Sequence, residues 1–297
     1  MKELPSDAVQ RFAHEAMGTI FEALIAGQEA GYAVQASQAA FQEIDRLEAL
    51  FSRFNPTSEI GQINRLQAGE SLNIGLDTFT CLRIAERIQR ETGGAFDINF
   101  RRPEGPSERP DFELLGGDPR FSVRLRPGFL GRSGSGLDLD LGAIGKGYAL
   151  DRAAAVLEDW SVERFLLHGG TSTTVAAGDG PDLGQGEAGW PVGVGGTWQL
   201  PDQPKRVLLK GRALSGSGTE VKGRHILDPR TGRPAEGHLA AWVSHPSAAA
   251  SDALSTAFMC LSSKEVRRYC EQHPEIWTLL ITPKKKGLFF NREALTA

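Results

Sequence analysis

The sequence predicts an α+β fold in which mixed or antiparallel sheets pack against helices. Strand and helix patterns mix along the chain without the regular strand–helix–strand alternation of a doubly wound sheet. The 35 glycines cluster at the ends of predicted strands instead of forming a flexible linker, which indicates backbone that approaches a ligand closely. With 297 residues, 40% of them hydrophobic, the chain can bury a sizeable core. We expect one domain over residues 1–297, with two intertwined subdomains as the alternative.

Hydrophobic periodicity and turn residues predict the elements in order. Apolar residues at helical spacing predict helices over residues 31–54 and 78–91, the second closed by Gly93 and Gly94. The other expected elements are an extended segment at 11–28, a loop with at most one short element at 101–120, a strand at 137–141 followed by a helix to about residue 158, strands at 163–170 and 206–214, a helix at 251–261 and a hairpin at 277–290.

Charge, cysteine content and hydropathy exclude several classes of protein. A formal net charge of -4 provides no broad basic field, so nucleic acid is not expected as a partner. Cys81, Cys260 and Cys270 are too scattered for a disulfide framework or for paired zinc ligands, and we expect plain buried thiols. No stretch approaches the ~18 apolar residues of a membrane span, and the first residues lack the apolar run of a secretory signal. As given, the chain is expected to be cytoplasmic. If the sequence is a trimmed form of a longer chain, an exported protein is expected instead.

The stretch LDLDLGAIGKGYALD, residues 137–151, combines a strand pattern with three glycines around a single lysine, Lys146. A Walker loop needs a glycine and a Ser or Thr where this chain has Asp140 and Gly147, and the dinucleotide fingerprint also fails. Glycines at a helix start still leave free N–H groups, and Lys146 adds a positive charge beside them. The stretch therefore indicates an anion site, with a tight turn and a surface lysine as the competing interpretation.

Two further segments carry candidate chemistry. In SDALSTAFMCL, Ser251 is a candidate N-cap, and Asp252 and Thr256 are four residues apart on a face other than the apolar one. That pair suits a hard cation such as Mg²⁺, which takes one or two carboxylates and completes its shell with water and phosphate; a helix-dipole partner is the alternative. His225 precedes the turn DPRTG, where it is either a structural histidine or a general base near a metal-bound phosphate.

Together these segments resemble the ApbE family of FAD-dependent flavin transferases, which move FMN from FAD onto a Ser or Thr of another protein. The matching pieces, in chain order, are AMGT at 16–19, FSRFNPTSEIGQIN at 51–64, TGGAFD at 92–97, DLGAIGKGYALD at 140–151, LHGG at 167–170, SGSG at 215–218 with HILDPRTGRP at 225–234, and SDALSTA at 251–257.

The resemblance implies a site for FAD and a site for a metal ion. The residues implied to line the FAD site are Met17, Phe54, Ala95, Phe96, Asp97, Asp140, Lys146 and Ile226. The residues implied to hold Mg²⁺ are Asp252, Thr256 and the backbone carbonyl of Ala143, with Ser255 near the same shell. In that arrangement the strand breaks so that Ala143 turns its carbonyl to the metal while Lys146 faces the pyrophosphate.

The implied reaction is attack by an acceptor hydroxyl on the phosphorus on the FMN side, with loss of AMP. His225 is the expected base, and an acceptor flavoprotein is the expected partner. A Mg²⁺-dependent FAD pyrophosphatase and a non-catalytic flavin-binding module are the alternatives.

The chain departs from the family pattern at four positions. Phe54 stands where relatives often have tyrosine, and Ser255 where some carry a second acidic ligand. Gly216 replaces a common threonine, and His168 precedes the glycine pair where asparagine or serine is usual.

Overall fold

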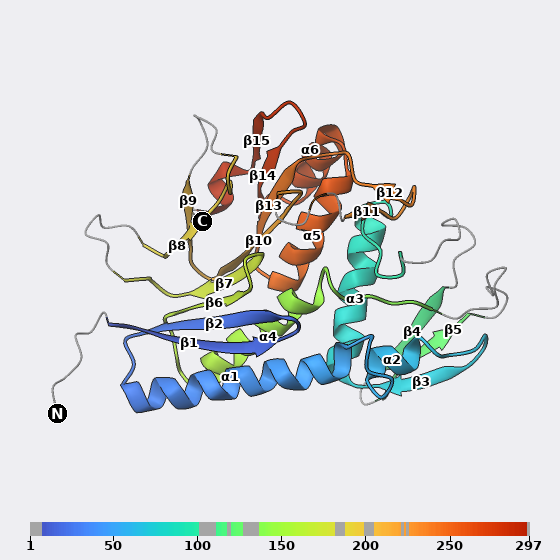
Figure 1. Ribbon diagram of the computed structural model, residues 1–297, viewed down its shortest axis with the longest axis horizontal. Helices are drawn as coiled ribbons and strands as arrows, with labels where there is room; N and C mark the ends of the chain where they lie inside the picture. The colour runs from blue at the N-terminus through green and yellow to red at the C-terminus, as the bar shows by residue number, and fades with distance from the viewer. Residues whose placement is uncertain are drawn as a thin grey trace.

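The main sheet of the protein is antiparallel throughout, and its strands lie side by side in the order in which they occur in the chain (Figure 1). The computed structural model describes residues 8–100, 111–117, 120–126, 137–181, 188–198, 205–220, 223 and 226–295. The eight strands of the main sheet are β1 (Val9–Ala16), β2 (Thr19–Ala26), β6 (Phe165–Gly169), β7 (Thr173–Ala177), β10 (Arg212–Gly218), β13 (Ala240–His245), β14 (Trp277–Ile281) and β15 (Gly287–Phe290). Every neighbouring pair is antiparallel, which confirms the α+β prediction.

Three smaller sheets accompany the main one within the described residues. They are β3 (Ser71–Ile74), β5 (Arg120–Leu125) and β4 (Phe112–Gly117); β8 (Trp190–Gly193) with β9 (Arg206–Leu209); and β11 (Leu227–Asp228) with β12 (Arg233–Pro234). The β8–β9 pair covers part of one face of the main sheet, where Trp190 and Leu209 are fully buried.

Helices cover the other face. These are α1 (Ala30–Phe51), α4 (Gly145–Asp159) and α5 (Ala248–Cys260), with α3 (Leu76–Glu91) packed beyond them against α5. The remaining helical elements are α2 (Glu59–Ile63), α6 (Ser263–Gln272) and the 3₁₀ turn η1 (Arg292–Leu295). Within α1, Ala36, Ala40, Ile44 and Leu47 share one buried face, as the 3.6-residue period requires. Among the described residues, no helix is both long and apolar enough to cross a membrane.

The segment predicted as extended over 11–28 is a hairpin. Its turn is Met17–Gly18, and both residues have positive φ angles, 50° and 69°. Glycine adopts this conformation freely, whereas a positive φ is uncommon for methionine. The sequence pattern showed the strands but not the turn between them.

The predicted strand at 137–141 is wrong as a sheet element, although its leucines are buried as expected. Leu137, Leu139 and Leu141 are all under 5% exposed, yet the segment joins no sheet. The side chain of Asn64 replaces a neighbouring strand: Nδ2 donates to the carbonyl of Leu139 at 3.1 Å, and Oδ1 accepts its N–H at 2.7 Å. Alternation of polar and apolar residues indicates which side chains are buried, but not which groups form hydrogen bonds with the backbone.

Two other boundaries differ from prediction. The single strand expected at 206–214 is two strands in different sheets, because Gly211 turns the chain with a φ of 61°. Helix α5 begins three residues earlier than expected, capped by Ser247 and not by Ser251. Ser251 instead donates from inside the helix to the carbonyl of Val243 at 2.6 Å. The C-terminal hairpin, β14–β15, is confirmed.

Candidate active site

The candidate site lies where the first turn of α4 meets α5. The Nζ atom of Lys146 lies 3.6 Å from Oδ2 of Asp252, and the N–H of Gly147 donates to the same oxygen at 3.3 Å. Nζ also donates to the carbonyl of Gly142 at 2.9 Å, which anchors the lysine to the turn before α4. The Asp252 side chain is only 6% exposed. The fold thus brings the buried carboxylate of Asp252 next to the positive charge of Lys146, although the two residues are far apart in the sequence.

The close approach of the two helices depends on Gly147. A Cβ atom at this residue would lie 2.2 Å from the carbonyl oxygen of Ala248 and 2.9 Å from Cα of Ala249. Only a residue without a side chain fits, which explains the glycine that follows Lys146. Small residues on α5 complete the contact.

Three hydroxyl groups lie next to Asp252. Oγ of Ser217, on β10, is 2.9 Å from Oγ of Ser255 and 3.3 Å from Oγ1 of Thr256. Ser255 donates to the carbonyl of Asp252 at 2.9 Å, and Thr256 to the same carbonyl at 3.4 Å. Ser217 was not among the predicted site residues. Its strand alternation within SGSG, which turns it toward α5, was the available signal.

This group of donors suits a hard cation. The carboxylate of Asp252 and the hydroxyls of Ser255 and Thr256 are hard oxygen ligands of the kind that Mg²⁺ takes. Among the described residues, no three His, Cys, Asp or Glu side chains come together as a metal site. A cation held by Asp252 would therefore need water and substrate phosphate to complete its shell, as is usual for Mg²⁺.

The turn that carries Ala143 is held by Asp140 and Arg53. Oδ1 of Asp140 accepts the N–H of Gly142 at 2.9 Å, and its Oδ2 lies 3.5 Å from Nε of Arg53. The Arg53 guanidinium also stands 4.5 Å over the ring of Phe54, which is 82% exposed. Phe54 thus presents a free aromatic face beside the turn, as a stacking role would require.

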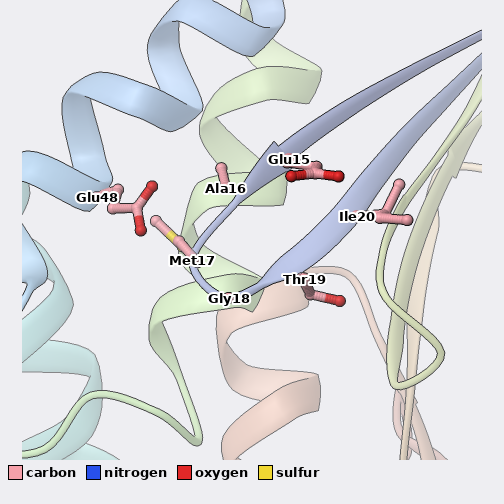
Figure 2. A pocket seen from close by; sticks show the side chains of 7 residues that line it. All are labelled: Glu15, Ala16, Met17, Gly18, Thr19, Ile20 and Glu48. Atoms are coloured by element: carbon pink, nitrogen blue, oxygen red, sulfur yellow. The ribbon is translucent and has the colours of Figure 1, made fainter.

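Met17 lines a pocket of about 440 Å³ at the β1–β2 turn (Figure 2). The lining residues are Glu15, Ala16, Met17, Gly18, Thr19, Ile20 and Glu48. The Met17 side chain points toward Glu48 of α1. Its positive φ is the backbone conformation that this two-residue hairpin turn requires, and it costs a methionine some strain.

The remaining predicted FAD residues lie near the turn of residues 228–232. Ala95 and Phe96 are 1% and 3% exposed, so both residues are buried in this structure. Oδ1 of Asp97 accepts the N–H of Asn99 at 2.8 Å, and Ile226 packs against the main core. His225 lies outside the described residues.

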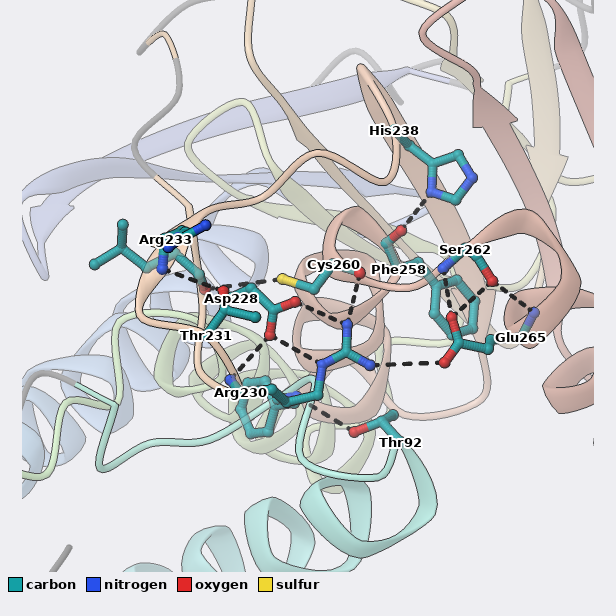
Figure 3. Close-up of polar contacts among 12 residues, drawn as sticks. Thr92, Asp228, Arg230, Thr231, Arg233, His238, Phe258, Cys260, Ser262 and Glu265 are labelled. Carbon is teal, nitrogen blue, oxygen red and sulfur yellow. Dashed lines mark hydrogen bonds and ion pairs between the residues drawn. The ribbon is translucent and has the colours of Figure 1, made fainter. Parts of the chain in front are cut away.

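Arg230 joins this turn to the ends of α5 and α6 (Figure 3). Its Nη2 donates to Oδ2 of Asp228 and to the carbonyl of Cys260, both at 2.8 Å, and Nη1 lies 3.6 Å from Glu265. The hydrogen bond to Asp228 raises the pKa of Arg230 above its usual value. Gly94 packs on the same arginine, so the segments around residues 94 and 228 are neighbours.

The structure shows the contacts of two residues that depart from the family pattern, Gly216 and His168. A Cβ atom at Gly216 would lie 2.8 Å from Nε1 of Trp242 on the adjacent strand, so the tryptophan occupies the space that a threonine would need. His168 lies 3.9 Å from Glu22 across the β2–β6 pair, and burial lowers its pKa.

Fold and site define an α+β protein in which a lysine and an aspartate meet beside several hydroxyl groups at a helix crossing, distinct from P-loop and Rossmann proteins. The sequence model of the ApbE family matches residues 17–280, and the chain belongs to the ApbE family.

Known proteins similar to this chain agree with that membership. The FAD:protein FMN transferase of Escherichia coli (strain K12) is 24% identical over 278 residues, which cover 84% of this chain and 78% of that protein. The apo flavinyl transferase ApbE of Pseudomonas stutzeri superposes with a TM-score of 0.76 at 21% identity, covering 97% of each chain. The ApbE protein of Thermotoga maritima gives 0.75 at 22% identity, covering 95% of this chain and 97% of its own. At these identities the solved structures show a shared fold.

Proposed function

We propose that this protein transfers FMN from FAD to a Ser or Thr hydroxyl of an acceptor protein and releases AMP. Membership of the ApbE family and the names of the curated relatives support the reaction class. The observation that carries the proposal is the placement of Lys146 against Asp252 at the start of α4, beside three hydroxyl groups. Such a site can hold a metal ion and a pyrophosphate together.

The chain's own groups would act on the pyrophosphate by position and charge. Lys146, in the first turn of α4, would bind its oxygens through its ammonium group. Asp252, Thr256 and the Ala143 carbonyl would hold Mg²⁺, which neutralises developing charge on the transferred phosphoryl group when bound. Phe54 would stack on a ring of FAD.

In the reaction, the acceptor oxygen forms a bond to the phosphorus on the FMN side as the bond from that phosphorus to the oxygen leaving with AMP breaks. The acceptor proton goes to a general base, for which His225 is our candidate. The products are a protein–FMN phosphoester and AMP. With water in place of the acceptor, the same residues would release FMN and AMP.

The test measures AMP release from FAD with Mg²⁺ and with EDTA, in the presence and absence of a Thr-containing acceptor peptide whose mass is followed. A mass gain of one FMN per AMP supports the transferase. AMP without a mass gain indicates a pyrophosphatase or the wrong acceptor. FAD binding without AMP indicates a binding module.

Replacing the proposed metal ligand tests the site itself. Asp252→Ala is expected to lower AMP release by at least about 10²-fold, since a transition-state electrostatic contact is lost. Asp252→Asn, which keeps the volume of this buried side chain, should lose activity equally while the fold is retained. Asp179→Ala, at an exposed aspartate paired with Lys210, is the control. Full activity in both Asp252 variants would contradict the assignment.

A further inference from the structure

Asp151, in the second turn of α4, binds the first turn of α5. Its carboxylate accepts hydrogen bonds from Oγ of Ser247 at 2.8 Å, from the N–H of Ala248 at 2.6 Å and from the N–H of Ala249 at 3.0 Å. These N–H groups begin a helix and have no partner within it. One carboxylate on α4 therefore supplies the hydrogen bonds that α5 lacks at its start.

The same face of α4 makes the contact with Asp252. Gly147 and Asp151 are four residues apart and so lie one above the other on the helix. Asp252 in turn lies one helical turn beyond Ala248 on α5. The two helices are thus joined at two points: Gly147 N–H to Asp252 at 3.3 Å, and Asp151 to the first turn of α5.

Helix α4 has a separate attachment, to α3. The hydroxyl of Tyr148 donates to Oδ1 of Asp77, at the start of α3, at 2.9 Å. Tyr148 is 5% exposed and its ring packs edge-on against Phe51 at 5.6 Å. With α4 held in this way, loss of the Asp151 contacts would release the first turn of α5 from α4, while Ser251 still ties the next turn to Val243.

We propose that Asp151 is a positioning residue that fixes Asp252 relative to Lys146 and thereby sets the metal affinity of the site. The proposal rests on the function proposed above in one respect, the use of Asp252 as a metal ligand. Burial, the largest influence, raises the pKa of the Asp151 carboxyl, against the three hydrogen bonds, which lower it. Those bonds come from Ser247, the N-cap of α5, and from the first two residues of the helix.

Changing the side-chain length at position 151 distinguishes a residue that positions Asp252 from one that only caps α5. Asp151→Glu keeps a carboxylate that can still accept from the start of α5, but places it one methylene further from α4. A residue that only caps α5 would tolerate this change. A residue that positions Asp252 would not, because the shift is passed one turn along the helix.

The readout is FAD binding, followed by quenching of flavin fluorescence at increasing Mg²⁺ concentrations, with AMP release measured in parallel. For Asp151→Glu and Asp151→Asn, we expect the Mg²⁺ concentration at half-maximal effect to rise about tenfold or more, as for other residues that orient metal ligands. Ser247→Ala, which removes one of the three donors, should give a smaller rise and remain folded.

The matched control is Asn291→Ala. Asn291 also makes three hydrogen bonds, to the carbonyls of Cys270, His273 and Ile276, and these tie α6 to β14 and β15. Its loss should lower stability without changing the Mg²⁺ requirement.

An unchanged Mg²⁺ requirement in folded Asp151 variants, or wild-type FAD binding that ignores Mg²⁺, would overturn the proposal. Wild-type protein that binds FAD with Mg²⁺ but releases no AMP would overturn the proposed function alone.

Discussion

Gly147→Ala tests the helix crossing on which the candidate site depends. The added Cβ would lie 2.2 Å from the carbonyl oxygen of Ala248, whereas carbon–oxygen contacts are normally about 3.3 Å, so α4 and α5 must separate by about 1 Å. Overpacking against backbone costs up to about 3 kcal/mol, and the higher helix propensity of alanine offsets about 1 kcal/mol. We therefore expect the free energy of unfolding to fall by about 2 kcal/mol.

The effect on activity should be larger than the effect on stability. A displacement of about 1 Å in a catalytic arrangement can lower the rate about 10²-fold. Urea unfolding and AMP release measure the two effects on the same preparation.

Gly145→Ala, two residues away on the same helix turn, is the matched control for Gly147→Ala. Its Cβ would meet Leu141 at 3.5 Å and Phe51 at 3.7 Å, which are ordinary contacts, so stability and activity should be unchanged or slightly higher. A Gly147→Ala protein with the wild-type urea midpoint and wild-type AMP release would refute the role of the close approach.

Two further changes have expected outcomes. Burial lowers the pKa of His245 to about 4, so unfolding takes up a proton at this residue as pH falls below its ordinary pKa, and about 2 kcal/mol of stability is lost between pH 7 and pH 5. Comparing urea midpoints at the two pH values, His245→Asn should show a smaller drop, and an equal drop would count against this assignment. Phe54→Ala should leave stability unchanged because the ring is 82% exposed, but weaken FAD binding about tenfold through lost stacking. Fluorescence titration checks this, with Phe54→Tyr as the control, and an unchanged affinity would exclude a stacking role.

The sequence predicted helices and strands correctly where the pattern of buried apolar residues alone determines the structure. The buried face of α1 and the β14–β15 hairpin are such cases. The segment at 137–141 was mistaken because its backbone is bound by the side chains of Asn64 and Asn99, contacts that no local pattern reports. Hydrogen-bond partners distant in sequence are set by the tertiary fold.

The sequence singled out several residues of the candidate site but did not predict how they are arranged in space. Lys146 and Asp252 were each singled out, but their meeting depends on a helix crossing that Gly147 permits. Ser217 and Asp151 were missed, since a serine in a strand and an aspartate in a helix show no chemistry until their neighbours are known. The predicted contacts with FAD and Mg²⁺ stay predictions.

The chain order of the main sheet has a consequence for synthesis. Each strand of this sheet after β1 pairs with the strand that precedes it in the sheet, so the sheet can grow strand by strand as the chain leaves the ribosome. Gly147 and Asp252 are 105 residues apart, which corresponds to about 5 to 20 seconds of translation. Six strands of the main sheet and the whole of α4 precede Asp252 in the chain, so Lys146 is made well before the carboxylate that it contacts. The site is therefore completed only after β13 has been added.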